Sequence, residues 1–272
     1  MDILKGSGET ETFDRDKFCR SLRLAGAPDR VVRKVCVLVE QELRPNASTE
    51  QIEKKTVRYL AKEDLLLAAR YRLRSAIMEL GPAGFFFEEY VAAILREYGY
   101  KTQVGTIMKG HCLSHEIDIL AEKENVHHII ELKYHNRRGF KTDVQVAMYS
   151  YARFLDITAA HKKFEEKKHV AWVVTNTKFT KSAITYATCM NIQLLGWQYP
   201  KSGSLEQLIE GKSLYPVTVL SSANRFVKEQ FAKQNLMFVR DLLQYSLSDL
   251  QKKFGFHPSL ANRLLQETYT LV

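Results

Sequence analysis

The sequence predicts an α/β protein in which a mixed β-sheet is flanked by helices. A small domain of one hairpin and several helices precedes the sheet, and a small all-helical domain follows it. Two observations predict the sheet: apolar residues in the middle of the chain recur at every second position, and strand-like and helix-like segments then alternate. A third predicts the flanking domains, because apolar residues on both sides keep the three-to-four-residue spacing of helices.

Composition and charge restrict the class of protein. With 272 residues, 45% of them hydrophobic and 26% charged, the chain is typical of a globular protein with one large or a few small domains. The N-terminus lacks the apolar segment of a signal peptide, and no apolar run approaches the ~18 residues that span a bilayer. We therefore expect a cytoplasmic protein without a membrane partner. The net charge of +9 weakly favours nucleic acid as a partner.

The four cysteines are scattered and form no CxxC pair, so neither a zinc ribbon nor a disulfide framework is indicated. We expect four reduced, mostly buried thiols. They are Cys19, Cys36, Cys112 and Cys189.

Residues 1–82 form the first predicted domain. Gly6 to Gly8 predict the turn of a short hairpin, and Asp14 predicts the N-cap of the helix that follows it. Gly81-Pro82 ends the last helix and the domain. Three helices are expected between these points, over about 29–43, 48–60 and 64–80.

Residues 83–200 form the second predicted domain, which carries the sheet. An amphipathic helix over 85–97 precedes three strands, after which helices and strands alternate. The run from Val170 to Thr175 is apolar and β-branched, which is typical of a strand buried on both faces. The expected strands are 101–108, 116–121, 126–134, 170–175 and 192–197, and the later helices are 143–155 and 180–190. Residues 213–272 form a third, all-helical domain.

Two charged strands carry the chemistry that the sequence indicates. Residues two apart on a strand face the same way, so Glu131 and Lys133 share one face while Ile130 and Leu132 point into the core. If the two strands form a hairpin, Asp118 lies beside Glu131. Two carboxylates with waters form a partial shell for Mg²⁺, and a nearby ammonium neutralises a phosphate or orients a water. The alternative is a solvated strand face without chemistry.

The segment from residue 84 to 197 resembles the PD-(D/E)xK nuclease fold in its Mrr-like, restriction-endonuclease branch. Five elements follow the order found in that branch. They are Phe87-Glu88 with Leu95 and Gly99-Tyr100, then Ile117-Asp118, Glu131-Leu132-Lys133, Gln145 to Tyr149, and Thr175 to Phe179 with Ala183 and Ile192 to Trp197. The segment Ser114-His115-Glu116 departs from the glycine- and aspartate-rich turn of many Mrr relatives and is similar to junction-resolving and repair nucleases of the same fold.

This resemblance implies a metal-dependent endodeoxyribonuclease, a hydrolase acting on DNA. The implied catalytic residues are Asp118, Glu131, Lys133 and Gln145, and the implied ligands of Mg²⁺, or of Mn²⁺ in its place, are Asp118, Glu131 and Glu88. Lys133 would assist the attacking water, and Gln145 would orient the phosphate or the lysine. Glu89 competes with Glu88 for the role of the further carboxylate.

Residues 1–80 resemble an ATP-cone, the nucleotide-sensing module of ribonucleotide reductases and their repressor. The matching residues are Lys5, Gly8, Glu11, Phe13, Asp14, Lys17, Ser21-Leu22, Ala25-Gly26, Thr49 and Ile52. The resemblance implies ATP or dATP as a regulatory ligand, with Lys5 and Lys17 at the phosphates and Glu11 and Asp14 at the base or ribose. Gly6 and Glu53 depart from the family pattern, so the alternative is a docking module that binds no nucleotide.

The C-terminal segment resembles a helix-hairpin-helix module, in which backbone N–H groups of the hairpin contact a DNA phosphate. The resemblance depends on the segment from Phe254 to Ala261 between two helical stretches, and His257 stands where the module usually has a second glycine. A helical packing or oligomerisation domain is the alternative.

Together these patterns indicate a Mg²⁺-dependent DNA endonuclease of restriction type that is regulated by nucleotide. The alternatives are a nucleotide-sensing DNA-binding regulator with an inactive nuclease fold, and a DNA repair or junction-resolving nuclease. The intact Asp118, Glu131 and Lys133 argue against the inactive regulator. The amino-acid sequence does not determine which DNA sequence is cut or whether cleavage depends on DNA modification. It is compatible with a monomer and with a homo-oligomer.

Overall fold

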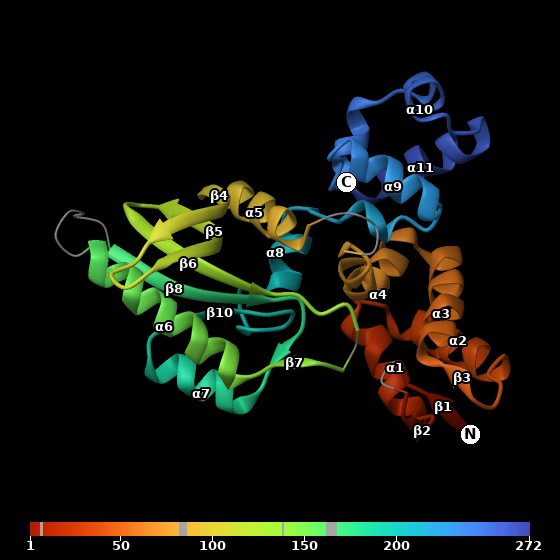
Figure 1. The fold of residues 1–272 in the computed structure, drawn as a ribbon. Helices are drawn as coiled ribbons and strands as arrows, with labels where there is room; N and C mark the ends of the chain where they lie inside the picture. Colours follow the sequence, from red (N-terminus) through yellow and green to blue (C-terminus); the bar gives the residue numbers. More distant parts are fainter. Residues whose placement is uncertain (6–7, 82–85, 138, 162–167) are drawn as a thin grey trace. The chain divides into compact units, whose positions relative to one another are not determined.

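The computed structural model describes residues 1–5, 8–81, 86–137, 139–161 and 168–272. Its contacts divide the chain into two compact units (Figure 1). The flanking unit comprises Met1–Gly84, Arg137–Gly139 and Tyr215–Val272, and the sheet unit comprises Phe85–Asn136 and Phe140–Leu214. The segments that we expect to form the first and third domains thus fall in one unit. The predicted turn at Gly6, the helix stop at Pro82 and the first residue of the helix predicted from residue 85 lie outside the described residues.

The N-terminal part of the flanking unit is a three-stranded sheet and four helices. Asp14 caps α1 as expected, because its carboxylate accepts the backbone N–H of Lys17 at 2.9 Å. Buried side chains of the helices, such as Leu22, Val35 and Leu60, form one core cluster. The sheet order is β2-β1-β3. The elements are β1 (Asp2–Leu4), β2 (Thr10–Thr12), α1 (Arg15–Leu24), α2 (Asp29–Gln41), β3 (Ala47–Ser48), α3 (Thr49–Glu63) and α4 (Leu65–Met78).

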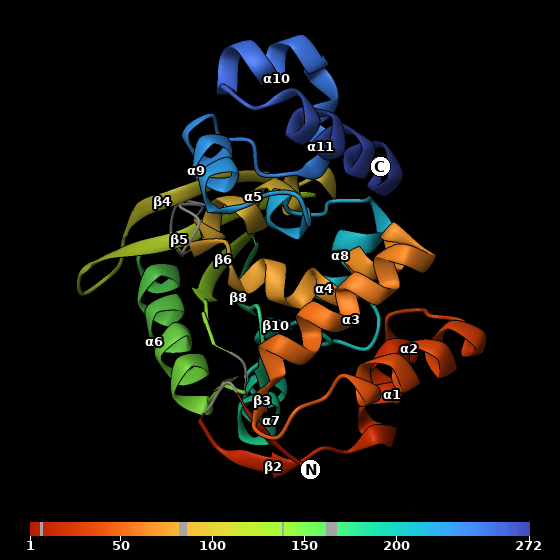
Figure 2. The ribbon, with the colours of Figure 1, turned by 90° about the vertical axis from the view of Figure 1, so that its right-hand side faces the viewer.

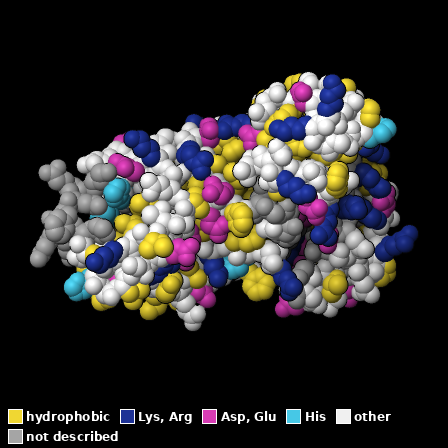
Figure 3. All heavy atoms as spheres, turned by 45° about the horizontal axis from the view of Figure 1, so that its top comes forward, with side chains coloured by type: hydrophobic (Ala, Val, Ile, Leu, Met, Phe, Trp, Pro, Cys, Tyr) yellow, Lys and Arg dark blue, Asp and Glu magenta, His cyan; other side chains and the backbone are white. Residues whose placement is uncertain are grey.

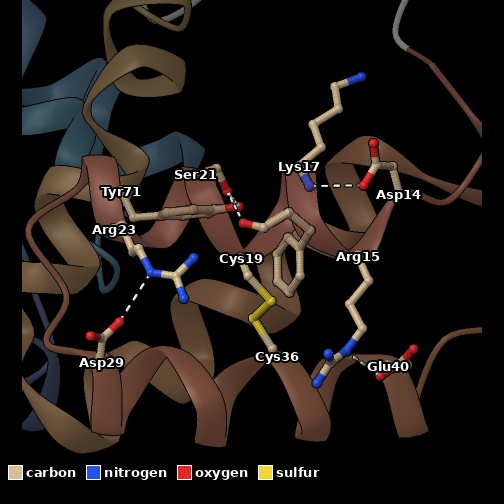
Figure 4. The surroundings of a disulfide bond; sticks show 11 residues. Asp14, Arg15, Lys17, Cys19, Ser21, Arg23, Asp29, Cys36, Glu40 and Tyr71 are labelled. Atoms are coloured by element: carbon tan, nitrogen blue, oxygen red, sulfur yellow. Dashed lines mark hydrogen bonds and ion pairs between the residues drawn. A yellow bond between two sulfur atoms is a disulfide. The ribbon is translucent and has the colours of Figure 1, made fainter.

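A disulfide joins α1 to α2 inside this core. Cys19 and Cys36 are bonded, with their Cα atoms 6.0 Å apart, and Figure 4 shows the bond between the two helices. The prediction of four reduced, mostly buried thiols is therefore wrong for this pair, and Cys112 and Cys189 are free but exposed. The spacing of cysteines in a sequence does not reveal which helices will pack together, and it is the packing of α1 on α2 that brings these two thiols into bonding distance.

The C-terminal part of the flanking unit is helical, and it packs on α4. The Thr218 hydroxyl donates to the carbonyl of Ala76 at 2.7 Å, and both residues are fully buried. Glu79, which follows α4, accepts from Arg72 of α4 and from Lys228, at 3.2 and 2.5 Å. These contacts hold the C-terminal helices against α4. Those elements are η2 (Val217–Val219), α9 (Arg225–Lys233), η3 (Val239–Gln244), α10 (Leu247–Phe254) and α11 (Pro258–Leu271).

The sheet unit contains the predicted mixed sheet. Five strands lie in the order β10-β8-β6-β5-β4. The pairs β4–β5 and β5–β6 are antiparallel, whereas β6–β8 and β8–β10 are parallel. This confirms a mixed sheet with helices around it. The elements are α5 (Phe87–Glu97), β4 (Lys101–Lys109), β5 (Ser114–Lys123), β6 (Val126–Lys133), β7 (Lys141–Thr142), α6 (Val144–His161), β8 (Lys168–Thr175), β9 (Lys178–Phe179), α7 (Lys181–Cys189), β10 (Gln193–Leu195) and α8 (Leu205–Gly211).

Helices cover both faces of this sheet, with α5 on one side and α6 and α7 on the other (Figures 1 and 2). Asp156 of α6 fixes the tip of the β4–β5 hairpin, because its carboxylate accepts the backbone N–H of Cys112 at 2.8 Å and lies 2.8 Å from Nε2 of His115. These contacts hold the pKa of Asp156 well below its usual range. Helix α6 is thereby fixed over the strands that carry the candidate site. Among the helices of the described residues, none combines the length and the apolar character needed to cross a membrane.

Candidate active site

Asp118 lies on β5 where the regular pairing with β6 ends. The register of the two strands runs from Lys123 opposite Val126 to Ile119 opposite Ile130. Beyond that last pair, Oδ2 of Asp118 accepts the backbone N–H of Leu132 at 2.6 Å. In a regular antiparallel pair a backbone carbonyl of β5 would accept this hydrogen bond. Here the Asp118 carboxylate accepts it, so the carboxylate lies beside the segment that carries Glu131 and Lys133.

The other neighbour of Asp118 in the sheet is Gly105 of β4. It lies between the residue pairs Val104–Ile119 and Thr106–Ile117, and its φ is +63°. A residue with a side chain would be strained in this left-handed conformation. No heavy atom lies within 4 Å of the place that a Cβ of Gly105 would occupy, so there is open space beside β4 at this position.

Glu131 of β6 faces α6, where Arg153 pairs with it. Nη1 of Arg153 lies 2.5 Å from Oε2 of Glu131, and the two side chains are only 12% and 23% exposed. Burial, followed by the charge of Asp118, raises the pKa of Glu131 to about 7, although Arg153 and Lys133 lower it. Burial also raises the pKa of Asp118, and the Leu132 N–H partly offsets this. Two carboxylates this close repel each other when both are ionised, so a cation beside them would be favourable.

Lys133 follows on the same face of β6 as Glu131 and is exposed. Ile130 and Leu132, which alternate with them, are 1% and 8% exposed, in agreement with the expectation that they point into the core. The carbonyl of Lys133 accepts the Thr175 hydroxyl of β8 at 2.7 Å, which fixes the backbone at this position. The sheet therefore brings together two carboxylates and an ammonium.

The donor set of Asp118 and Glu131 suits a hard divalent cation. Mg²⁺ takes oxygen ligands, keeps several of its waters and is commonly held by one or two carboxylates. The described residues contain no group of three or more His, Cys, Asp and Glu side chains that could hold a metal, so the site supplies two protein carboxylates. Glu88 lies in the first turn of α5, is partly exposed and is not brought into such a group. Its role as a ligand therefore stays a prediction.

Gln145 and Arg153 lie on α6. Gln145 is exposed in the first turn, and its backbone N–H donates to Asp143 at 3.1 Å. We did not single out Arg153 from the sequence, although its spacing carried a signal. Gln145, Tyr149 and Arg153 are four residues apart, which places them along one face of the helix.

A polar network that we did not predict fixes the loop after β6. Asn176 accepts the backbone N–H of His135 at 2.8 Å and donates to its carbonyl at 2.7 Å. The Thr142 hydroxyl lies 3.2 Å from the His135 ring and 2.9 Å from the Thr175 hydroxyl. Burial, and then the charge of Lys133, lowers the pKa of His135. The resemblance had matched Thr175 and Asn176 as part of a motif, and the structure gives them this anchoring role.

The residues predicted to bind nucleotide lie around the N-terminal hairpin. Lys5 and Lys17 both pair with Glu11, at 2.8 and 3.0 Å, whereas Asp14 is occupied in capping α1. Both ammonium groups lower the pKa of Glu11. Glu53, which departs from the family pattern, is 9% exposed and accepts from the Ser75 hydroxyl at 2.5 Å, so it is part of the packing of α3 on α4.

The C-terminal hairpin lies between α10 and α11. Gly255 adopts the left-handed conformation with φ +69°, and its N–H and that of Phe256 close the end of α10. His257 is the N-cap of α11: its Nδ1 accepts the N–H of Ser259 at 3.4 Å. The imidazole thus covers a helix N-terminus that would otherwise be available to a phosphate.

Comparisons with known proteins cover the sheet unit and the C-terminal helices. Residues 82–198 match a family model described as restriction endonuclease, and residues 215–272 match one described as AF1548-like, C-terminal. An uncharacterized protein of Archaeoglobus fulgidus is 35% identical over 185 residues, which are 67% of this chain and 99% of that protein. The crystal structure of AF1548, a protein of unknown function, matches with a TM-score of 0.55 and 35% identity over 67% of this chain and 94% of that chain. The chain therefore belongs to the family of AF1548-like proteins and has a central domain similar to restriction endonucleases.

Proposed function

We propose that this protein is a divalent-metal-dependent DNA endonuclease of restriction type. The observation that carries the proposal is the approach of Asp118 and Glu131 on neighbouring strands, with Lys133 next on the same face of β6. The match of residues 82–198 to the restriction endonuclease model supports DNA as the substrate. The net charge of +9 adds weaker support, although Figure 3 shows basic side chains interspersed with acidic ones on the drawn face.

In this proposal each side chain has a distinct task. Asp118 and Glu131 would hold Mg²⁺ or Mn²⁺ with their carboxylate oxygens. A bound divalent cation supplies a water of lowered pKa and screens the charge that develops on the phosphate. Lys133 is exposed at the end of β6 and neutralises the scissile phosphate or orients the attacking water. Gln145, from the first turn of α6, orients the phosphate or Lys133.

Plasmid cleavage tests the proposal. Full-length protein should cleave plasmid DNA with Mg²⁺ or Mn²⁺ and lose all cleavage with EDTA. Lys133→Met should abolish cleavage while the circular dichroism spectrum is unchanged, since this side chain is exposed and its loss leaves no cavity. Lys109→Met, at an exposed position of β4, is the matched control and should retain full activity. Cleavage that survives EDTA would refute the metal-dependent mechanism.

A panel of DNA substrates distinguishes restriction-type cleavage from the alternative functions. Modified and unmodified plasmids distinguish a restriction enzyme, whereas branched junctions distinguish a repair or junction-resolving nuclease. A protein that binds all of these DNAs with metal present and cleaves none would be the nucleotide-sensing regulator with an inactive nuclease fold.

Nucleotide binding in the N-terminal part is a second proposed function. Lys5 from the hairpin and Lys17 from α1 converge on Glu11, so two ammonium groups meet where the ATP-cone resemblance places phosphates. ATP or dATP would replace Glu11 as their partner and regulate cleavage. Calorimetry on the full-length protein should detect ATP or dATP, and Lys5→Ala with Lys17→Ala should remove most of the affinity. Lys54→Ala on the exposed face of α3 is the control. If millimolar nucleotide gives no heat of binding and no shift of the melting temperature, the N-terminal part is a docking module that binds no nucleotide.

A further inference from the structure

Arg153 of α6 forms an ion pair with Glu131, one of the two candidate metal ligands. Its Nη1 lies 2.5 Å from Oε2 of Glu131. The guanidinium carbon lies 5.3 Å from the centre of the Tyr149 ring, one helical turn earlier. The Arg153 side chain is 12% exposed and Tyr149 is 59% exposed, so the guanidinium lies between a half-buried carboxylate and a ring that reaches solvent.

A divalent cation and this guanidinium would compete for the same oxygen. Mg²⁺ and Mn²⁺ coordinate carboxylate oxygens at about 2 Å, so such an ion approaching Oε2 of Glu131 from the side of Arg153 would need the space that Nη1 now occupies at 2.5 Å from this oxygen. The two cations also repel each other, and partial burial weakens the screening of that repulsion. The form of Glu131 that is paired with Arg153 is therefore poorly suited to accept the metal.

We propose that Arg153 is a displaceable counter-ion of Glu131, which occupies the carboxylate until a divalent cation takes it and so sets the metal affinity of the site. The proposal rests on the proposed function, in which Asp118 and Glu131 hold the metal. Arg153 is in this sense a positioning residue that acts through Glu131.

The surroundings of Arg153 suit such an exchange. Tyr149 offers the guanidinium a ring face toward solvent, at a distance typical of cation–π contacts. A small cavity of about 10 Å³ between the sheet and α6 is lined by Glu131, Arg153, Ser150 and Trp172 among others. Helix α6 itself is fixed by Asp156, which confines the exchange to the Arg153 side chain.

The exchange has a thermodynamic consequence that can be measured without cleavage. The apparent affinity of a ligand falls in proportion to the fraction of molecules in the competent state. If Arg153 holds Glu131 in about nine molecules of ten, its removal raises the apparent metal affinity about tenfold. A residue that merely supports the fold would produce no change or a loss of affinity.

Calorimetric titration of the full-length protein with Mn²⁺ at pH 8.5, without DNA, tests the proposal. Arg153→Gln should bind Mn²⁺ about tenfold more tightly than the unsubstituted protein, and Arg153→Lys, which keeps the charge but loses the planar fork, should lie between them. Arg96→Gln is the matched control, because Arg96 forms an exposed helix ion pair with Glu89 at 3.5 Å in the same unit. Its Mn²⁺ affinity should be unchanged.

Two results would overturn the proposal and are distinguishable. Equal or weaker Mn²⁺ binding by Arg153→Gln, with an unchanged circular dichroism spectrum, would refute the counter-ion role and leave the metal site intact. If Arg153→Gln does not fold, equal affinity in Arg153→Lys and the unsubstituted protein refutes it. Failure of the unsubstituted protein to bind Mn²⁺, or equal binding by Asp118→Asn, would refute the metal site of the proposed function and the counter-ion role with it.

Discussion

The carboxylate of Asp118 accepts the backbone N–H of Leu132 at 2.6 Å, and Leu132 lies between Glu131 and Lys133 in the chain. One hydrogen bond thus joins the acidic residue of β5 to the segment of β6 that carries the other two candidate catalytic groups. Asp118 has a structural partner as well as a proposed ligand role, and substitutions there have to be chosen to separate the two.

Asp118→Asn should strongly reduce cleavage without unfolding the protein. The amide oxygen of asparagine still accepts the Leu132 N–H but binds a divalent cation poorly, so we expect a loss of activity of roughly 100-fold or more. Asp118→Ala leaves that N–H without its acceptor and should also lower the free energy of unfolding, by about 1–3 kcal/mol. Glu124→Gln, at an exposed position in the turn between β5 and β6, is the control. Plasmid cleavage and urea unfolding measure the two effects, and equal activity of Asp118→Asn and Glu124→Gln would contradict the assignment.

Glu131 predicts how metal binding depends on pH. Its pKa is raised to about 7, so it is mostly protonated at pH 6 and mostly ionised at pH 8. A metal ion has to displace that proton, so Mn²⁺ affinity should rise by up to about tenfold per pH unit below 7 and level off above 8. Calorimetry at four pH values provides the curve. An affinity that is flat between pH 6 and 8 would contradict the combination of a ligand role for Glu131 with a pKa raised to about 7.

The same raised pKa predicts a pH dependence of stability in the metal-free protein. The folded state binds the Glu131 proton more tightly than the unfolded state, whose pKa is near 4.5. This contribution is fully present below pH 4.5 and is lost as pH rises through about 7, on the order of 3 kcal/mol in all. Trp172 and Trp197 both lie in the sheet unit, so tryptophan fluorescence during urea unfolding reports on this unit. Glu131→Gln should show a smaller loss of stability between pH 5 and 8, and an unaltered loss would argue against the raised pKa.

The disulfide between Cys19 and Cys36 should stabilise the flanking unit. Closing a loop of this length lowers the entropy of the unfolded chain by an amount worth about 3 kcal/mol. Protein denatured without reductant should show two titratable thiols, and four after reduction. Cys36→Ala should lower the melting temperature of the flanking unit, whereas Cys112→Ser and Cys189→Ser should not, because those thiols are free and exposed. Four titratable thiols before reduction would contradict the pairing.

Basic residues beside the C-terminal hairpin should contribute to DNA affinity. Lys252 and Lys253 are exposed in the last turn of α10, next to the hairpin. Replacing both by alanine should weaken DNA binding. It should also reduce the salt dependence of the affinity, because the two lost lysine–phosphate contacts no longer release condensed counterions on binding. Lys233→Ala, at the end of α9, is the control. Fluorescence anisotropy at several salt concentrations gives the slope of the logarithm of the DNA affinity against the logarithm of the salt concentration. An unchanged slope would favour a packing role for these helices.

The sequence by itself determined the sheet of this protein and the position of its candidate site. Alternating residues in β5 and β6 and the apolar run of β8 are local signals, so the predicted strands agree with the structure to within about two residues. The same alternation put Glu131 and Lys133 on one face and buried Ile130 and Leu132. Asp118 could be placed beside Glu131 because two adjacent antiparallel strands leave few other arrangements.

Only the tertiary structure decided the contacts between distant segments. Arg153 meets Glu131 across 22 residues of chain, Cys19 meets Cys36 across 17, and Thr218 meets Ala76 across 142. Such pairs depend on how helices pack on the sheet and on one another, and the periodicity of one helix does not identify the element that packs against it. Periodicity in a sequence reports which face of an element is buried, whereas the partner that buries it is selected by the fold as a whole.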